Sequence, residues 1–115
     1  MRVFDSHSHY NDEKFDEDRE KILHEIYEAG ITKIIVAGYD IESSKKAIDL
    51  SNKYDFIYAI CGISPNDILK TENEIIKQIK KIENIAKADK VVGIGEIGLD
   101  YYWNKENKEL QQMAF

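Results

Sequence analysis

The sequence predicts an α/β protein built around a parallel sheet. Short apolar runs alternate with longer amphipathic segments along the 115 residues, the order expected of repeated strand–helix units. Most of the runs are apolar at successive positions, so they lack the alternation of a half-solvated strand and read as strands covered on both faces. Each unit spans about 30 residues, the size of a βαβ module. We therefore expect right-handed crossovers between parallel strands.

The predicted strands and helices alternate along the chain, beginning with a strand and ending with a helix. The first strand begins at Val3, and the first helix, over residues 16–29, has apolar side chains at helical spacing with Gly30 as its stop. The helix over residues 72–88 carries an isoleucine stripe opposite lysines and glutamates. The other strands are expected at residues 34–37, 56–61 and 91–94, and the other helices at residues 41–53 and 105–115.

Composition limits the kind of partner and the compartment. Sixteen basic against 22 acidic residues give a net charge of −6, which argues against a broad basic surface that grips phosphates. A nucleic-acid substrate would then need a metal or a local patch of positive charge. With one cysteine, no internal disulfide can form, and the N-terminus lacks an apolar signal region, so we expect a cytoplasmic protein. No apolar run approaches the length of a membrane span, so no membrane partner is expected.

His7 and His9 form the first candidate site. Residues two apart on an extended segment point to the same side, so both imidazoles can reach one metal ion. The pair follows the first strand, where α/β proteins bind ligands, and this favours metal ligation over a merely structural pair. Asp5 lies two residues before His7, so its side chain points to the same side as the two histidines and is expected to orient one imidazole.

Glu96 is the candidate third ligand. It follows an apolar, glycine-rich strand, where a carboxylate is costly to bury unless it meets a cation. The alternative is a solvated glutamate at a strand end. Two histidines and one carboxylate suit a hydrolytic zinc site and, less strongly, a site for manganese, iron or nickel. We expect the three side chains to converge at the C-terminal ends of adjacent or near-adjacent strands.

Four other features are weaker candidates. His24 lies off the apolar face of its helix, so we expect it to be solvated. Cys61, inside an apolar strand, is expected to be a small buried side chain, and Ser64 before Pro65 suits a turn better than a nucleophile. The aromatic run at residues 101–103 either stacks on a base or ring, or packs beneath a loop.

Three blocks of the sequence resemble the TatD family of metal-dependent deoxyribonucleases, which belong to the amidohydrolase-like metal hydrolases. They are residues 5–9 (DSHSH), residues 62–65 (GISP) and residues 95–101 (GEIGLDY), in the family's order and at similar spacing over the whole chain. The third block is the most specific. The histidine pair alone would equally suggest an amidohydrolase or a phosphoesterase of the polymerase and histidinol phosphatase type.

The resemblance implies a divalent metal site that cleaves phosphodiester bonds of DNA with metal-activated water. His7 and His9 would bind one ion, and Glu96 would bridge to a second and so also count as catalytic. Two ions per complete site, zinc, magnesium or manganese, would clamp the attacking and leaving oxygens. They would also let an acidic protein handle DNA or another phosphodiester substrate.

The sequence departs from the family in two ways. Ser64 stands where the family usually has a histidine, so the resemblance implies no substrate contact there. Family members are also longer (β/α)8 barrels, whose later strands supply two further histidine ligands and a catalytic aspartate that this sequence lacks. Residues 1–115 are therefore expected to form a single partial domain, the N-terminal half of a TIM-type barrel with about four strands and three to four helices.

Such a half barrel is expected to be inactive alone. We expect it to self-associate or to pair with a missing C-terminal half, because apolar side chains such as Ile35, Ile57 and Ile94 would face no opposing layer. Two alternatives remain open at this point. One is a non-catalytic, truncated or assembly-dependent barrel fragment, and the other is a related metal hydrolase acting on a small phosphoester or amide.

Overall fold

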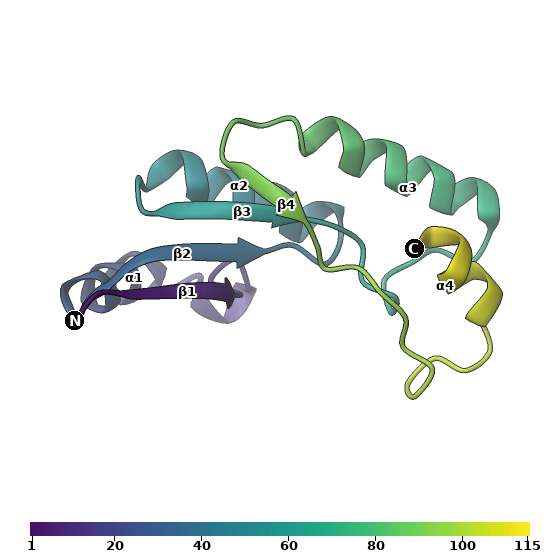
Figure 1. The fold of residues 1–115 in the computed structure, drawn as a ribbon, viewed down its shortest axis with the longest axis horizontal. Helices are drawn as coiled ribbons and strands as arrows, with labels where there is room; N and C mark the ends of the chain where they lie inside the picture. Colours follow the sequence, from purple (N-terminus) through teal and green to yellow (C-terminus); the bar gives the residue numbers. More distant parts are fainter.

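A computed structural model, which describes all 115 residues, shows one sheet of four parallel strands in the order β1-β2-β3-β4 (Figure 1). The predicted α/β class and parallel sheet are confirmed. The strands are β1 (Val3–Ser8), β2 (Ile31–Ala37), β3 (Ile57–Cys61) and β4 (Val91–Ile94). The helices are α1 (Arg19–Glu28), α2 (Ile41–Lys53), α3 (Glu72–Ile85) and α4 (Lys108–Ala114), with a short 3-10 turn η1 (Glu13–Phe15).

Element boundaries differ from the sequence prediction by three residues or more at β1, α1 and α4, and also at β2, which begins at Ile31, and at α3, which ends at Ile85. β1 runs on to Ser8 and so includes His7, because the polar residues after Phe4 still pair with β2. α1 begins only at Arg19, whose guanidinium donates to the carbonyl oxygens of Tyr10 and Asp12 and holds the preceding loop in place. α4 begins at Lys108 rather than at residue 105.

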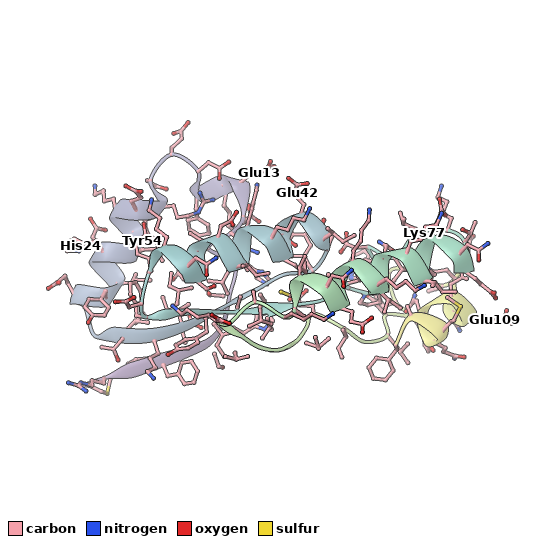
Figure 2. All side chains as sticks on the ribbon, turned by 90° about the horizontal axis from the view of Figure 1, so that it is seen from above. Glu13, His24, Glu42, Tyr54, Lys77 and Glu109 are labelled. Carbon is pink, nitrogen blue, oxygen red and sulfur yellow. The ribbon has the colours of Figure 1, made fainter.

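Helices α1, α2 and α3 lie on one face of the sheet (Figures 1 and 2). On that face the side chains of β2 and β3 are fully buried against Leu23 of α1 and Ala47 of α2. Removing this apolar surface from water is the main stabilising contribution to the fold. We call it the covered face, and its strand residues are Ile34, Val36, Ile57 and Ala59.

The other face of the sheet carries no helix (Figure 2). Ile35 of β2 and Ile60 of β3 alternate with the buried residues and are only partly buried, and Phe4 of β1 is 58% exposed. We call this the uncovered face. None of the helices combines the length and the apolar composition that crossing a bilayer requires.

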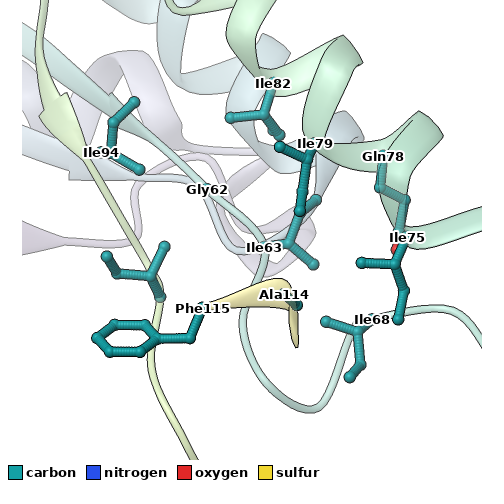
Figure 3. Close-up of a pocket in the computed structure, with 11 residues that line it drawn as sticks. Gly62, Ile63, Ile68, Ile75, Gln78, Ile79, Ile82, Ile94, Ala114 and Phe115 are labelled. Carbon is teal, nitrogen blue, oxygen red and sulfur yellow. The ribbon is translucent and has the colours of Figure 1, made fainter. Parts of the chain in front are cut away.

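Two of the residues expected on the uncovered face lie elsewhere. Ile57 is fully buried on the covered face, because its register partner is the core residue Ile34. Ile94 is 56% exposed, but it lines a cavity of about 210 Å³ together with Ile79 and Ile82 of α3 (Figure 3). An uncovered apolar surface does exist, but Ile35 is the only member of the predicted set that belongs to it.

Candidate metal centre

The segments that carry the candidate ligands come from opposite edges of the sheet. His7 lies in β1 and Glu96 lies just beyond the end of β4, and the strand order places β2 and β3 between them. The expectation that these residues sit on adjacent or near-adjacent strands is therefore wrong.

The chain beyond β4 closes this gap by crossing the end of β3. The Gly95 N–H donates to the carbonyl of Cys61 over 2.9 Å, and the Glu96 N–H donates to the carbonyl of Gly38, just after β2, over 2.6 Å. A Cβ atom on Gly62 would lie 2.4 Å from the carbonyl oxygen of Glu96. Only a glycine at position 62 lets the two backbones pass this closely.

The loop after β2 is fixed at the same edge of the sheet. Asp40 caps α2, because its carboxylate accepts from the Ser43 N–H over 2.7 Å while the Ser43 hydroxyl accepts from the Asp40 N–H over 3.0 Å. This capping box starts the helix directly after the strand. The carbonyl of Gly38 accepts the hydrogen bond from the Glu96 N–H. Gly38 also lies tight against α2, because a Cβ atom on it would be 2.1 Å from the Ser44 hydroxyl oxygen.

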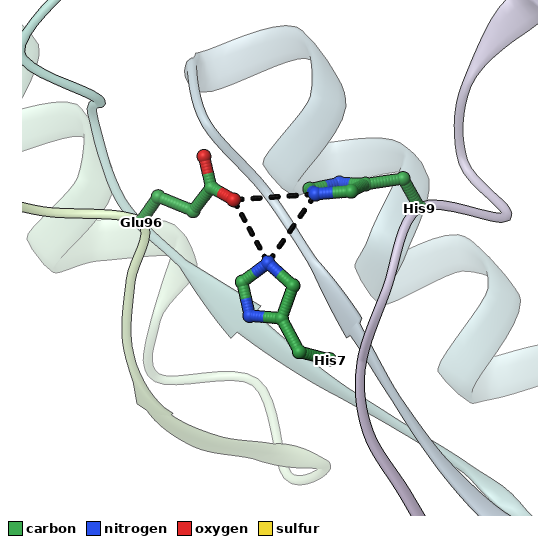
Figure 4. Close-up of side chains that lie close together, drawn as sticks. All are labelled: His7, His9 and Glu96. Carbon is green, nitrogen blue, oxygen red and sulfur yellow. Dashed lines mark hydrogen bonds and ion pairs between the residues drawn. The ribbon is translucent and has the colours of Figure 1, made fainter.

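The side chains of His7, His9 and Glu96 converge on one point (Figure 4). The Nε2 atoms of the two histidines are 3.3 Å apart, and Glu96 Oε1 lies 2.8 Å from Nε2 of His7 and 3.2 Å from Nε2 of His9. The side chains are between 32% and 50% exposed, so solvent and solutes can reach them. No other group of histidine, cysteine and carboxylate side chains in the chain brings at least three donor atoms within 4.8 Å of one another.

The donor set fits a divalent cation. His9 Nδ1 lies 3.3 Å from the carbonyl oxygen of Ala37, which can only accept, so Nδ1 is the donor there and Nε2 is the ring nitrogen that can bind a metal ion. His9 Nε2 lies 3.2 Å from Glu96 Oε1, so a cation placed between them could contact both atoms. Donor atoms of a tetrahedral zinc site lie about 3.3 Å from one another, close to the separations found here.

Asp5 does not orient an imidazole ring as the sequence predicted. Its Oδ1 accepts from the backbone N–H of His7 over 3.2 Å. A carboxylate two residues before an N–H closes a local turn with its own backbone in this way. Asp5 therefore shapes the backbone that presents His7, and the ring-orienting contact of the site is made instead by the Ala37 carbonyl on His9.

Tyr39 is a neighbour of the site that the sequence did not single out. Its ring packs edge-on against the His9 ring, with 5.9 Å between centroids. Burial, and then the nearby carboxylates of Asp40, Asp12 and Asp67, raise the pKa of the Tyr39 phenol, so it stays neutral at physiological pH. The signal that could have identified it is its place beside Gly38, at the end of an apolar strand.

The weaker candidates behave as the sequence predicted. His24 is exposed on α1. Cys61 is fully buried and burial raises the pKa of its thiol, so it is no activated nucleophile. The Ser64 hydroxyl donates to the Asp67 carboxylate and its N–H donates to the Tyr39 carbonyl over 2.7 Å, which makes Ser64 a turn residue.

The structure tests one of the two alternatives that the sequence left open for the aromatic run, packing beneath a loop. Tyr101 packs on α4, with its hydroxyl accepting from Gln112 over 2.9 Å and the Lys108 ammonium over its ring. Tyr102 and Trp103 are 74% and 79% exposed. Packing beneath a loop is thus excluded for these two rings.

Comparison with known proteins agrees with this site. The family described as TatD related DNase matches residues 4–115. The uncharacterized metal-dependent hydrolase YabD of Bacillus subtilis is 36% identical, and the 3'-5' ssDNA/RNA exonuclease TatD of Pectobacterium carotovorum is 32% identical; each match covers 98% of this chain and 43% of the relative. The crystal structure of the TatD homologue YjjV from Escherichia coli K12 superposes with a TM-score of 0.84 at 30% identity, over 98% of this chain and 43% of that one.

The chain therefore spans less than half the length of these relatives. Its strands and helices correspond to the N-terminal half of the fold of the TatD homologue. Homologues of this chain are named as metal-dependent hydrolases and as nucleases, in keeping with the cluster of His7, His9 and Glu96. With the family match extending from β1 to α4, the chain belongs to the TatD family of related DNases.

Proposed function

We propose that this chain supplies the first metal-binding half of a phosphodiesterase site that acts on DNA. The observation that carries the proposal is the convergence of three metal-ligand atoms, His7 Nε2, His9 Nε2 and Glu96 Oε1, with 2.8 to 3.3 Å between them. Two imidazoles and a carboxylate can bind zinc, manganese or magnesium, ions of increasing hardness. Measurement decides which ion is bound.

The proposed roles of the residues follow from their surroundings. His7 and His9 would hold one ion, with His9 kept in the right tautomer by the Ala37 carbonyl. Glu96 would help to hold that ion and a second one, which makes it the catalytic carboxylate of this half. A bound divalent ion would supply acidified water and a counter-charge for the phosphodiester.

This half of the site is proposed to be insufficient for hydrolysis. Residues 1–115 would form a single partial domain, the N-terminal half of a TatD-like barrel, and would offer three protein ligands but no general base of their own to activate water. Losing a general base costs about 10²- to 10⁴-fold in rate. A second half, from elsewhere or from a partner copy seated on the uncovered face, would have to complete the site. The single, buried Cys61 favours the reducing cytoplasm as its compartment.

Calorimetric titration with zinc or manganese tests the proposed metal site. We expect saturable binding that is lost in His9→Gln and retained in His24→Gln, a matched change at an exposed histidine on α1. Equal binding by the two variants would overturn the proposed site.

A second assay tests whether this half is insufficient for hydrolysis and, if it does hydrolyse, whether it acts on DNA or on a small phosphoester. Labelled single-stranded DNA and bis(p-nitrophenyl) phosphate are incubated with the chain and added metal. We expect no hydrolysis above background of either compound, because the general base is missing. Cleavage of the small diester alone would contradict a DNA substrate, and metal-dependent degradation of DNA would contradict the claim that this half is insufficient.

A further inference from the structure

The loop between β4 and α4 carries two exposed aromatic rings. Tyr102 and Trp103 are 74% and 79% exposed, and their rings meet edge to face at 89°, with 4.8 Å between centroids. Rings of this size are usually buried in a core or an interface, because each carries a large apolar surface. Two of them side by side in solvent, on a chain with a single tryptophan, therefore call for a partner.

The backbone beneath these rings is fixed by hydrogen bonds. Asp100 Oδ1 accepts from the N–H groups of Tyr102 and Trp103, each over 3.0 Å. The buried Gln111 side chain accepts from the Asp100 N–H over 2.7 Å and donates to its carbonyl over 3.0 Å. The rings are thus presented by a turn that is already ordered, so binding would cost little loop entropy.

The same turn is tied to the edge of the sheet that carries the metal centre. Asp100 Oδ2 accepts from the side chain of Asn66, in the loop after β3, over 3.0 Å. Tyr102 is six positions after Glu96, so the Cα atoms of the two residues lie within about 22 Å of each other even if the chain were fully extended. A chain-like substrate held at Glu96 can therefore reach the rings.

Charge decides which partner suits the loop. Lys105 and Lys108 are exposed beside the rings, but so are Glu106 and Glu109, and the whole chain has a net charge of −6. A grip on phosphates alone would therefore be weak, whereas stacking on bases does not depend on net charge. Unpaired bases offer flat faces for such stacking, and paired bases inside a duplex do not.

We propose that Tyr102 and Trp103 form a stacking platform for unpaired bases, which holds a single-stranded nucleic acid beside the metal centre. This inference rests on the proposed function and adds to it the two residues that would position the strand. In the edge-to-face pair the edge of one ring covers part of a face of the other, but both rings stay largely exposed, so each can still stack on a base, and two bases held at once would be splayed apart.

Fluorescence of Trp103, the single tryptophan, reports on the platform directly. The 115-residue chain is titrated with a thymidine dodecamer in EDTA, so that neither metal binding nor cleavage contributes. We expect saturable quenching by the dodecamer and none by an abasic strand of the same length. Equal quenching by both strands would mean that phosphates alone are recognised and would overturn the proposal.

Variants then locate the contact. Tyr102→Ala is expected to weaken binding about 5- to 150-fold, Tyr102→Phe to restore most of it, and Phe4→Ala, an exposed aromatic on β1, to leave it unchanged. Trp103→Ala is followed through the anisotropy of a labelled strand, with the same expected loss. Unchanged affinity in both alanine variants would overturn the platform, as would binding of duplex DNA as tightly as of the single strand.

Failure of this inference and failure of the proposed function can be told apart. Glu96→Gln is expected to lose metal binding while the quenching in EDTA persists. Quenching without any metal binding by the parent chain would leave the platform standing and refute the metal centre. Metal binding without base-dependent quenching would refute the platform and leave the metal centre standing.

Discussion

The two faces of the sheet contain isoleucines of the same strands but place them in different surroundings. On the covered face Ile34 and Ile57 are fully buried against α1 and α2. On the uncovered face Ile35 and Ile60 alternate with them and are only partly buried, with no helix above them. The covered face holds the fold together, and the uncovered face and the strand ends remain available for binding.

This difference explains how the metal centre can be assembled on so small a chain. Rigid packing on one face fixes the strand ends. As a result, His7 Nε2 on β1 and Glu96 Oε1 after β4 lie 2.8 Å apart, although β1 and β4 are the two edge strands of the sheet. Ligands held by packed strands keep their geometry better than ligands on free loops. Changes to the covered face should therefore affect stability, and changes elsewhere should affect binding.

The largest expected effect is the loss of stability in Ile57→Ala. Ile57 is fully buried, so truncation removes buried methyl groups and leaves a cavity, which lowers the free energy of unfolding by about 2 to 5 kcal/mol. Phe4→Ala, on the uncovered face, should change it by less than about 1 kcal/mol. Urea denaturation followed by circular dichroism measures both, and equal losses would remove the distinction between the two faces.

Glu96→Gln should separate binding from stability. The change keeps the shape and removes the charge of a metal ligand. Mutating a residue that only supports a ligand lowers metal affinity about 10- to 100-fold, so losing the ligand's own charge should lower it by at least as much. The free energy of unfolding without metal should change little, since the Glu96 side chain is 32% exposed and partly solvated. Calorimetric titration with zinc or manganese and urea denaturation provide the two readings, with the exposed Glu109→Gln as the matched control.

The sequence predicted most of the fold because parallel strands are apolar on both faces and stand out between amphipathic helices. It could not predict which face the helices would cover. Ile57 and Tyr58 lie in one continuous apolar run, where periodicity does not distinguish the two sides, and only the pairing of Ile57 with Ile34 decides it.

The candidate site was predictable in its residues but not in its construction. His7, His9 and Glu96 could be selected from their chemistry and their places at strand ends. That the two edge strands meet depends on the crossing at Gly62 and on the hydrogen bond from Glu96 to Gly38, contacts between residues distant in the sequence. The contact between Ala37 and His9 was missed for the same reason, because a backbone carbonyl carries no sequence signal.

Self-association should depend on the uncovered face. Phe4 is 58% exposed there, and unpaired strand edges and exposed apolar side chains favour association between copies. We expect the chain to form dimers or larger species by multi-angle light scattering at micromolar concentration, and Phe4→Glu to shift it toward monomer. The matched change His24→Glu, on the exposed side of α1, should have no effect. A parent chain that stays monomeric would show that the uncovered face is stable in water without a partner.

The smallest expected effect is that of Ser64→Ala, a change in the loop that follows β3. Its hydroxyl donates to Asp67 and makes no contact with His7, His9 or Glu96, so metal affinity should stay within about twofold of the parent. Stability should fall by about 0.5 to 1.5 kcal/mol, because the turn loses one hydrogen bond while the Ser64 N–H keeps its bond to Tyr39. Calorimetry and urea denaturation again give the two values. A marked loss of metal affinity would mean that this turn positions the ligands, so that the strand ends are not fixed by the covered face alone.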